Sequence, residues 1–122
     1  MDSPQAEAAR TLQFIYRGNL YNVDRAHPTL QLGRDDGNDI VILSLFASRI
    51  HARVTQRDGR FVLTDLSSNG TFLLAEDASG EQAAELRLHG GEAVLPERGW
   101  LGIGRPASRH GDHSLRFAVR EA

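Results

Sequence analysis

The sequence predicts an all-β fold, an antiparallel β-sandwich of about eleven strands, and three observations support this. Apolar and polar residues alternate with a period of two over short segments, and turn residues separate these segments. The one weakly helical stretch, 76–86, is interrupted by Ser79 and Gly80, so we expect a surface loop there. The clearest hairpin is apolar on one face only, as in a sheet that covers a core.

Eleven segments carry the strand pattern. Residues 1–10 offer little apolar surface to bury, so we expect a tail or linker there and one domain over 11–122. The predicted strands are 11–16, 20–25, 29–33, 39–42, 48–57, 60–66, 71–74, 86–88, 93–95, 100–104 and 114–120.

The hairpin around Asp58-Gly59 has the clearest register. Asp-Gly between two extended runs is typical of a two-residue type I′ turn, which pairs Arg57 with Arg60. A slip of one residue would turn the apolar side chains to solvent, so the alternation fixes the pairing. The apolar face then carries Ile50, Ala52, Val54, Phe61 and Leu63, and the polar face carries Arg53, Thr55, Arg57, Arg60 and Thr64.

Composition excludes several classes of protein. The chain has 14 basic and 16 acidic residues among 122, a formal net charge of −2, whereas non-specific nucleic-acid binding needs a basic face. It has no cysteine, which removes disulfides, thiolate nucleophiles and cysteine-based metal sites. Because the sequence has neither a signal-peptide pattern nor an apolar run of roughly 20 residues, we expect a cytoplasmic protein that binds neither membrane nor nucleic acid.

Three polar motifs lie at the ends of predicted strands or in the turns beside them: Gly33-Arg34, Ser48-Arg49-Ile50-His51 and Ser67-Ser68-Asn69-Gly70-Thr71. A phosphate ester presents a nearly dianionic group with three acceptor oxygens, so a receptor for such a group needs a fixed cation and several converging donors. Arg34 offers a planar fork of donors, and Arg49 offers a second positive charge. Ser48 and Ser68 add hydroxyl donors.

The remaining motif residues suit other roles. The Asn69 amide has both a donor and an acceptor, which suits it to hold the backbone of a peptide. Gly70 is expected to supply a positive φ angle, and Thr71 and His51 are expected to hold the loops in place. Hairpin parity puts His51 on the polar face beside Leu66, where a ring nitrogen can bond the backbone of a neighbouring loop.

In this order, with Asn38-Asp39-Ile40 between the first two, the motifs resemble those of the forkhead-associated (FHA) domain, a β-sandwich that binds phosphothreonine peptides. The resemblance is strong over 29–71 and looser as far as Val119. It implies a signalling module that binds a phosphothreonine-containing protein or peptide and has no catalytic activity, metal or cofactor. It assigns the phosphopeptide to Arg34, Ser48, Arg49, Ser68 and Asn69, and the loop structure to Gly33, His51, Gly70 and Thr71.

The chain departs from the FHA pattern in three places. Phe72-Leu73-Leu74 replaces an asparagine that is common after Asn-Gly-Thr, and Gly90-Gly91-Glu92 with Gly99-Trp100 replaces a shorter Gly-Asp segment. The insertion 76–85 is expected either to cover part of the peptide groove or to contact another domain. The motifs, with Gly104-Arg105-Pro106, are also similar to FHA domains attached to bacterial adenylate or guanylate cyclases.

Other functions fit the sequence less well. Ser48, His51 and Asp65 are the residue types of a hydrolase triad, but a serine and a histidine three apart on an extended segment point to opposite faces. His110 and His113 lack a third metal ligand, and the glycines in 102–104 lack the further glycine of a nucleotide motif. Two alternatives stay open, namely a phosphorylation-independent scaffold that binds through an outer sheet face and a regulatory domain of a cyclase.

Overall fold

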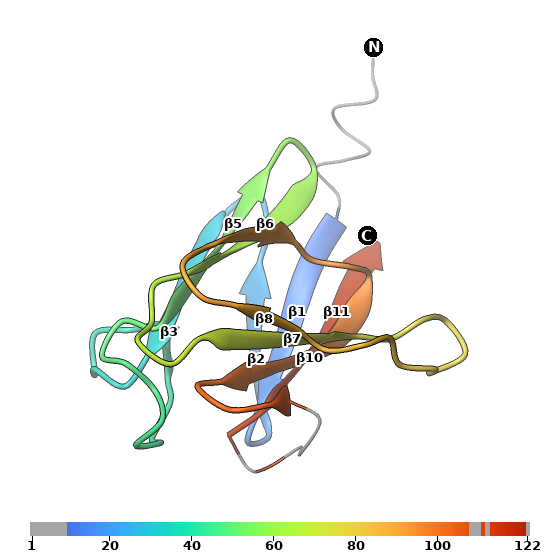
Figure 1. Cartoon of the computed structure of the whole chain (residues 1–122). Helices are drawn as coiled ribbons and strands as arrows, with labels where there is room; N and C mark the ends of the chain where they lie inside the picture. The colour runs from blue at the N-terminus through green and yellow to red at the C-terminus, as the bar shows by residue number, and fades with distance from the viewer. Residues whose placement is uncertain (1–9, 108–110, 112, 122) are drawn as a thin grey trace.

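In the part of the chain that the structure describes, eleven strands form two sheets that pack face to face, as the alternation predicts (Figure 1). The structure is a computed structural model and describes residues 10–107, 111 and 113–121. The strands are β1 Arg10–Tyr16, β2 Asn19–Val23, β3 Thr29–Gly33, β4 Ile40–Val41, β5 Ala52–Arg57, β6 Arg60–Asp65, β7 Thr71–Ala75, β8 Leu86–Leu88, β9 Gly91–Val94, β10 Arg98–Ile103 and β11 Leu115–Glu121.

The two sheets differ in size and in pairing. The six-stranded sheet has the order β2-β1-β11-β10-β7-β8, and the five-stranded sheet has the order β4-β3-β5-β6-β9. Among the described strands, the pairing is antiparallel as predicted, except that β3 and β4 pair in parallel. The loop 34–39 reverses the chain twice before β4 begins, and the backbone N–H of Asp39 bonds the carbonyl of Gln31 at 2.8 Å.

The hairpin of β5 and β6 has the predicted turn and register. Asp58 and Gly59 have φ angles of 54° and 77°, as a type I′ turn requires. Val54 pairs with Leu63, and both are buried in the core. Ile50 was predicted to join them, but it precedes β5 and is 45% exposed. That prediction was wrong because the carbonyls of Ser48 and Arg49 bond the loop that follows β3 instead of a neighbouring strand.

The core lies between the sheets. Leu12, Phe14 and Phe117 from the six-stranded sheet meet Leu32 and Leu63 from the five-stranded sheet, and all are buried. The rings of Phe14 and Phe117, a cross-strand pair, lie 6.1 Å apart. This packing fixes the positions of the strand ends from which the loops at one end of the sandwich extend.

Strand ends fall within two residues of the prediction, apart from β5, which begins at Ala52 rather than at residue 48. Residues 76–85 form a surface loop, as predicted, at the far end of β7 from Thr71 (Figure 1). Among the described residues, no helix has the length and hydropathy to span a bilayer.

Candidate functional site

The first two motif loops are bonded directly to each other. The backbone N–H of Arg34 donates to the carbonyl of Ser48 at 2.9 Å, and that of Asp35 donates to the carbonyl of Arg49 at 3.1 Å. The Arg34 side chain adds a bond from Nε to the carbonyl of Ala47 at 3.1 Å. This bond, made by the nitrogen nearest the side-chain stem, fixes the guanidinium group of Arg34 against the loop 42–51.

Gly33 allows this close approach. A Cβ atom at this position would lie 2.3 Å from the carbonyl oxygen of Arg49 and 2.9 Å from the backbone nitrogen of His51. Any other residue would push the loops apart, which explains why glycine precedes Arg34.

The third loop, 66–70, joins the same cluster. The hydroxyl oxygen of Ser48 accepts the backbone N–H of Ser68 at 3.0 Å. The Asn69 amide nitrogen donates to the carbonyl of Phe46 at 3.1 Å. All three motifs therefore meet at one end of the sandwich, on the left side of Figure 1.

His51 lies buried beneath the loops and bonds two of them. The backbone N–H of Ser48 donates to its Nδ1 at 3.0 Å, and its Nε2 bonds the carbonyl of Gly70 at 2.9 Å. Because Nδ1 accepts, we assign the neutral tautomer with the proton on Nε2. Burial lowers the pKa of His51 below its usual value of 6.5, which favours this neutral form.

A buried carboxylate organises the turn at Gly70. The hydroxyls of Ser67 and Thr71 each donate to Asp65 Oδ1 at 2.6 Å, and the N–H of Gly90 donates to Oδ2 at 2.7 Å. Ser67 also accepts the N–H of Gly70 at 2.7 Å. Burial of Asp65 opposes its ionisation, but the hydrogen bonds from Ser67 and Thr71 outweigh burial and lower its pKa below 3.8.

Gly70 itself has a φ angle of +96°, which agrees with the predicted positive value. The Gly70 carbonyl accepts a hydrogen bond from Nε2–H of His51 at 2.9 Å and another from the backbone N–H of Gly104 at 3.0 Å. Thr71 is buried and bonds Asp65, so it contributes to the loop from within the sandwich.

Two positioning residues were missed by sequence reasoning. Asn38 is buried, and its amide nitrogen donates to the carbonyls of Asp35 and Arg49 at 2.9 and 2.8 Å. Asp65 was considered only as a triad member, although its place on the core-facing side of β6 was visible in the hairpin pattern. A carboxylate at a core position is a sign of a buried hydrogen-bond network.

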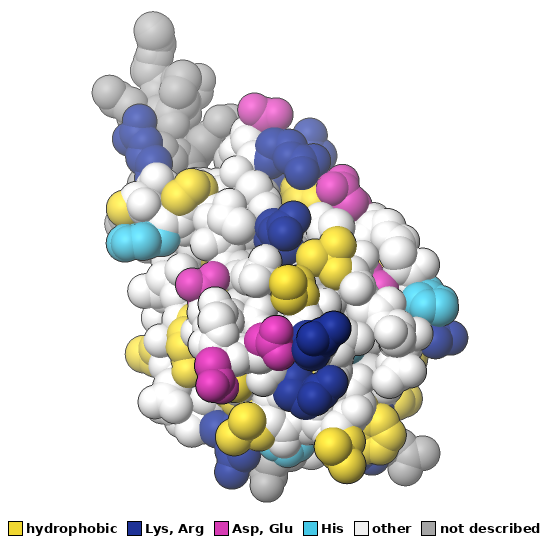
Figure 2. Space-filling view, turned by 90° about the vertical axis from the view of Figure 1, so that its left-hand side faces the viewer, with side chains coloured by type: hydrophobic (Ala, Val, Ile, Leu, Met, Phe, Trp, Pro, Cys, Tyr) yellow, Lys and Arg dark blue, Asp and Glu magenta, His cyan; other side chains and the backbone are white. Residues whose placement is uncertain are grey.

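Several donors in the cluster remain available to a ligand. The two terminal amino groups of Arg34 bond no other described residue, and the Ser48 hydroxyl is still able to donate its proton. Arg49, Ser68 and Asn69 are exposed. In Figure 2, which looks onto this side of the molecule, basic side chains lie next to acidic ones. The arrangement suits an anion bound at the surface, close to the ends of β3 and β6.

The triad is not formed. The backbone N–H of Ser48, rather than its hydroxyl, bonds the His51 ring, and the other ring nitrogen bonds Gly70. Of the histidines weighed as metal ligands, His110 lies outside the described residues, and His113 bonds the Tyr16 hydroxyl at 2.7 Å.

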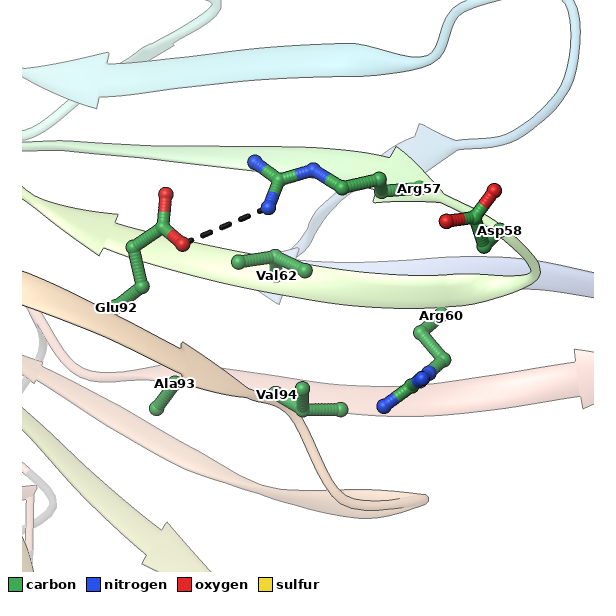
Figure 3. Close-up of a pocket in the computed structure, with 7 residues that line it drawn as sticks. All are labelled: Arg57, Asp58, Arg60, Val62, Glu92, Ala93 and Val94. Atoms are coloured by element: carbon green, nitrogen blue, oxygen red, sulfur yellow. Dashed lines mark hydrogen bonds and ion pairs between the residues drawn. The ribbon is translucent and has the colours of Figure 1, made fainter.

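Two other parts of the chain lie away from the loops. The insertion 76–85 does not cover the cluster, because the length of β7, about 13 Å, separates it from Thr71. A hollow of about 300 Å³ lies at the far end of the β5–β6 hairpin, with Val62 and Val94 among its lining residues (Figure 3). Arg57 reaches across it and forms an ion pair with Glu92 at 3.5 Å.

Comparisons with known proteins agree with this architecture. The FHA-1 domain of Rv1747 from Mycobacterium tuberculosis is 22% identical with a TM-score of 0.61, and the match covers 92% of this chain and 98% of that one. Mycobacterium tuberculosis EmbR, in complex with a low affinity phosphopeptide, is 26% identical with a TM-score of 0.64, over 94% of this chain and 25% of that one.

A yeast structure has the same fold. The N-terminal FHA domain of S. cerevisiae Rad53p, in complex with a phosphothreonine peptide, is 16% identical with a TM-score of 0.57, over 92% of this chain and 94% of that one. No curated protein matches this chain in sequence. The sequence model of the FHA domain matches residues 30–93, more than half of the chain, and this segment holds all three motifs. The chain therefore belongs to the FHA domain family.

Proposed function

We propose that this FHA domain binds phosphothreonine-containing segments of partner proteins through Arg34, Ser48, Arg49, Ser68 and Asn69. The observation that carries the proposal is the bonding of Ser48 to the loops of both Arg34 and Ser68, which groups the donors at one place. The complexes of Rad53p with a phosphothreonine peptide and of EmbR with a phosphopeptide support this ligand class.

Each side chain has a role in the proposed complex. The bond from Arg34 Nε to Ala47 fixes the guanidinium plane, so that its terminal amino groups donate to two phosphate oxygens. The hydroxyls of Ser48 and Ser68 donate to the same group, and Arg49 adds positive charge. One side-chain N–H of Asn69 donates to the backbone carbonyl of Phe46. The other side-chain N–H and the side-chain oxygen Oδ1 bind the peptide backbone.

The threonine methyl group accounts for part of the expected selectivity. Burying one carbon contributes about 0.8 kcal/mol, which is roughly a fourfold preference for phosphothreonine over phosphoserine. The proposed function includes no catalysis, and both ring nitrogens of His51, which a Ser48–His51 pair would need, are held by backbone groups. We place the module in the cytoplasm, where kinases have the ATP to phosphorylate a partner, and cell fractionation tests this location.

Selection from a degenerate phosphothreonine peptide library tests the binding proposal. The wild type should recover a defined set of peptides, and Arg34→Ala should recover none. Arg60→Ala, at an exposed arginine on the far end of the hairpin, serves as the matched control. Equal recovery by wild type and Arg34→Ala would contradict the proposal and favour a phosphorylation-independent scaffold.

A second candidate is a regulatory role within a longer signalling protein, such as a nucleotide cyclase. The match to EmbR favours it, because the FHA fold there accounts for a quarter of the chain. Determining which domains flank these residues in the full-length gene product tests this candidate. A product with no cyclase domain would exclude the cyclase assignment.

A further inference from the structure

The outer face of the six-stranded sheet has a row of large side chains where polar residues are expected. The row runs across five neighbouring strands through the cross-strand pairs Leu20–Ile15, Ile15–Arg116, Arg116–Trp100 and Trp100–Leu74. The residues on either side of each member along its strand face the core or end the strand, so this row faces away from the core. A sheet with one face on a core is normally polar on the other.

Part of this row, which we call the Leu20 row, is open to solvent. Leu20 is 61% exposed and Ile15 is 39% exposed, although the two are direct cross-strand neighbours. Trp100 is half-buried, and Leu74 is buried. Contiguous exposed apolar side chains are a feature of interaction surfaces, whereas single ones need no explanation.

A basic hollow adjoins the row. It has a volume of about 170 Å³ and is lined by Glu97, Arg98, Arg116, Ala118, Val119 and Arg120. Its one carboxylate, on Glu97, is paired with Arg10. Arg120 forms no ion pair within the described part of the chain. The hollow is therefore positively charged, although the chain as a whole has a net charge of −2.

The middle of the row is held in place. The Arg116 guanidinium lies 5.3 Å from the centre of the Trp100 ring and pairs with Glu76 at 3.4 Å. The Trp100 indole N–H donates to the same Glu76 carboxylate at 3.0 Å. Tryptophan and arginine are the side chains that contribute most at protein interfaces, and an ordered pair loses little entropy on binding.

We propose that the Leu20 row and the adjoining hollow dock an unphosphorylated acidic segment of a partner protein. Apolar side chains of the segment cover Leu20 and Ile15, and its carboxylates enter the hollow beside Arg98 and Arg120. Charge complementarity selects an acidic occupant over a basic or neutral one. The surface uses none of the residues assigned to the phosphopeptide, so the two sites do not compete for the same side chains.

A phage-displayed library of short random unphosphorylated peptides tests this surface. The library is selected on the wild-type chain and counter-selected on the double variant Leu20→Ser/Ile15→Thr. We expect enriched peptides with Asp or Glu beside apolar residues. A synthetic copy of one should bind both the double variant and Arg120→Glu about tenfold more weakly than the wild type, measured by calorimetry.

Matched controls come from the other sheet. Val94→Thr and Arg60→Glu change an exposed apolar and an exposed basic position there and should bind the peptide as the wild type does. Unchanged affinity for a phosphothreonine peptide shows that every variant is folded and separates this proposal from the phosphopeptide site, which depends on Arg34.

Three results would overturn the proposal. The first is a selection that yields no peptide dependent on Leu20 and Ile15, and the second is a set of enriched peptides without acidic residues. The third is self-association of the wild type that the double variant loses, since a second copy of the chain would then occupy the surface.

Discussion

The hydroxyl oxygen of Ser48 accepts the backbone N–H of Ser68 at 3.0 Å, across 20 positions of the chain. The carbonyl of the same serine accepts the N–H of Arg34 at 2.9 Å. Ser48 therefore links all three motif loops and still has a proton to donate. Loss of the Ser48 hydroxyl therefore removes both a bond between two loops and a donor to the ligand.

Replacing Arg34 with alanine should weaken phosphothreonine-peptide binding more than about a hundredfold. Each charge-assisted hydrogen bond contributes about 1.5 to 3 kcal/mol, and the guanidinium is proposed to make two. Arg34→Lys should restore only part of the affinity, because an ammonium group keeps the charge but not the planar fork. Fluorescence anisotropy with a labelled peptide measures both. A loss of less than threefold for Arg34→Ala would argue against this role.

Ser48→Ala should weaken phosphopeptide binding about tenfold and lower the free energy of unfolding by about 1 kcal/mol. The change removes one donor to the phosphate and the acceptor of the Ser68 N–H. Calorimetry and urea denaturation measure the two effects separately. Ser79→Ala, in the distant 76–85 loop, is the control for affinity. Unchanged binding by Ser48→Ala would show that its hydroxyl only links the loops.

His51 should make the domain less stable in mild acid. Its pKa is lowered by burial, so the unfolded chain takes up a proton more readily than the folded one. The stabilisation is fully present above pH 6.5 and decreases as the pH falls from 6.5 towards the folded-state pKa. Protonation of Nδ1 would also remove the acceptor of the Ser48 N–H and place two donors against each other.

Urea denaturation between pH 8 and pH 5, compared for wild type and His51→Gln, measures this contribution. The variant should be less stable at pH 8 but should lose less stability on acidification. Parallel pH profiles for the two proteins would assign the loss to other groups.

Asp65→Asn should lower the free energy of unfolding by about 2 to 4 kcal/mol. The amide keeps one acceptor, but it loses the charge that strengthens the bonds from Ser67, Thr71 and Gly90. Because the pKa of Asp65 is lowered, its contribution is present above pH 3.8 and is lost as the pH falls through the folded-state pKa. Thermal and urea denaturation measure it, with the exposed Asp36→Asn as control. Equal stability of the two variants would contradict the buried network.

Local sequence patterns were sufficient to predict the structure of the β5–β6 hairpin. Alternation and the Asp58-Gly59 turn predicted both the register and the burial of Val54 and Leu63, because turn geometry and one buried face act over neighbouring residues. The same parity placed His51 where its ring reaches a backbone carbonyl of another loop. These features depend on contacts within or next to one hairpin.

Contacts between distant segments were not predictable in this way. Ile50 has the alternation of a strand residue, but the backbone N–H groups of Arg34 and Asp35 bond the carbonyls of the two residues before it. The role of Asn38 depends on where the carbonyl of Arg49 falls, which no local pattern shows. The Leu20 row appears only once the strand order places β2, β1, β11 and β10 side by side.

Calorimetric titration of one selected peptide, in its phosphothreonine, phosphoserine and unmodified forms, tests the central proposal most directly. The wild type should bind the phosphothreonine form, bind the phosphoserine form at least about fourfold more weakly, and show no heat with the unmodified form. Arg34→Ala should bind none of them. Equal affinity of the wild type for all three forms, unchanged in Arg34→Ala, would contradict phosphothreonine recognition by these loops.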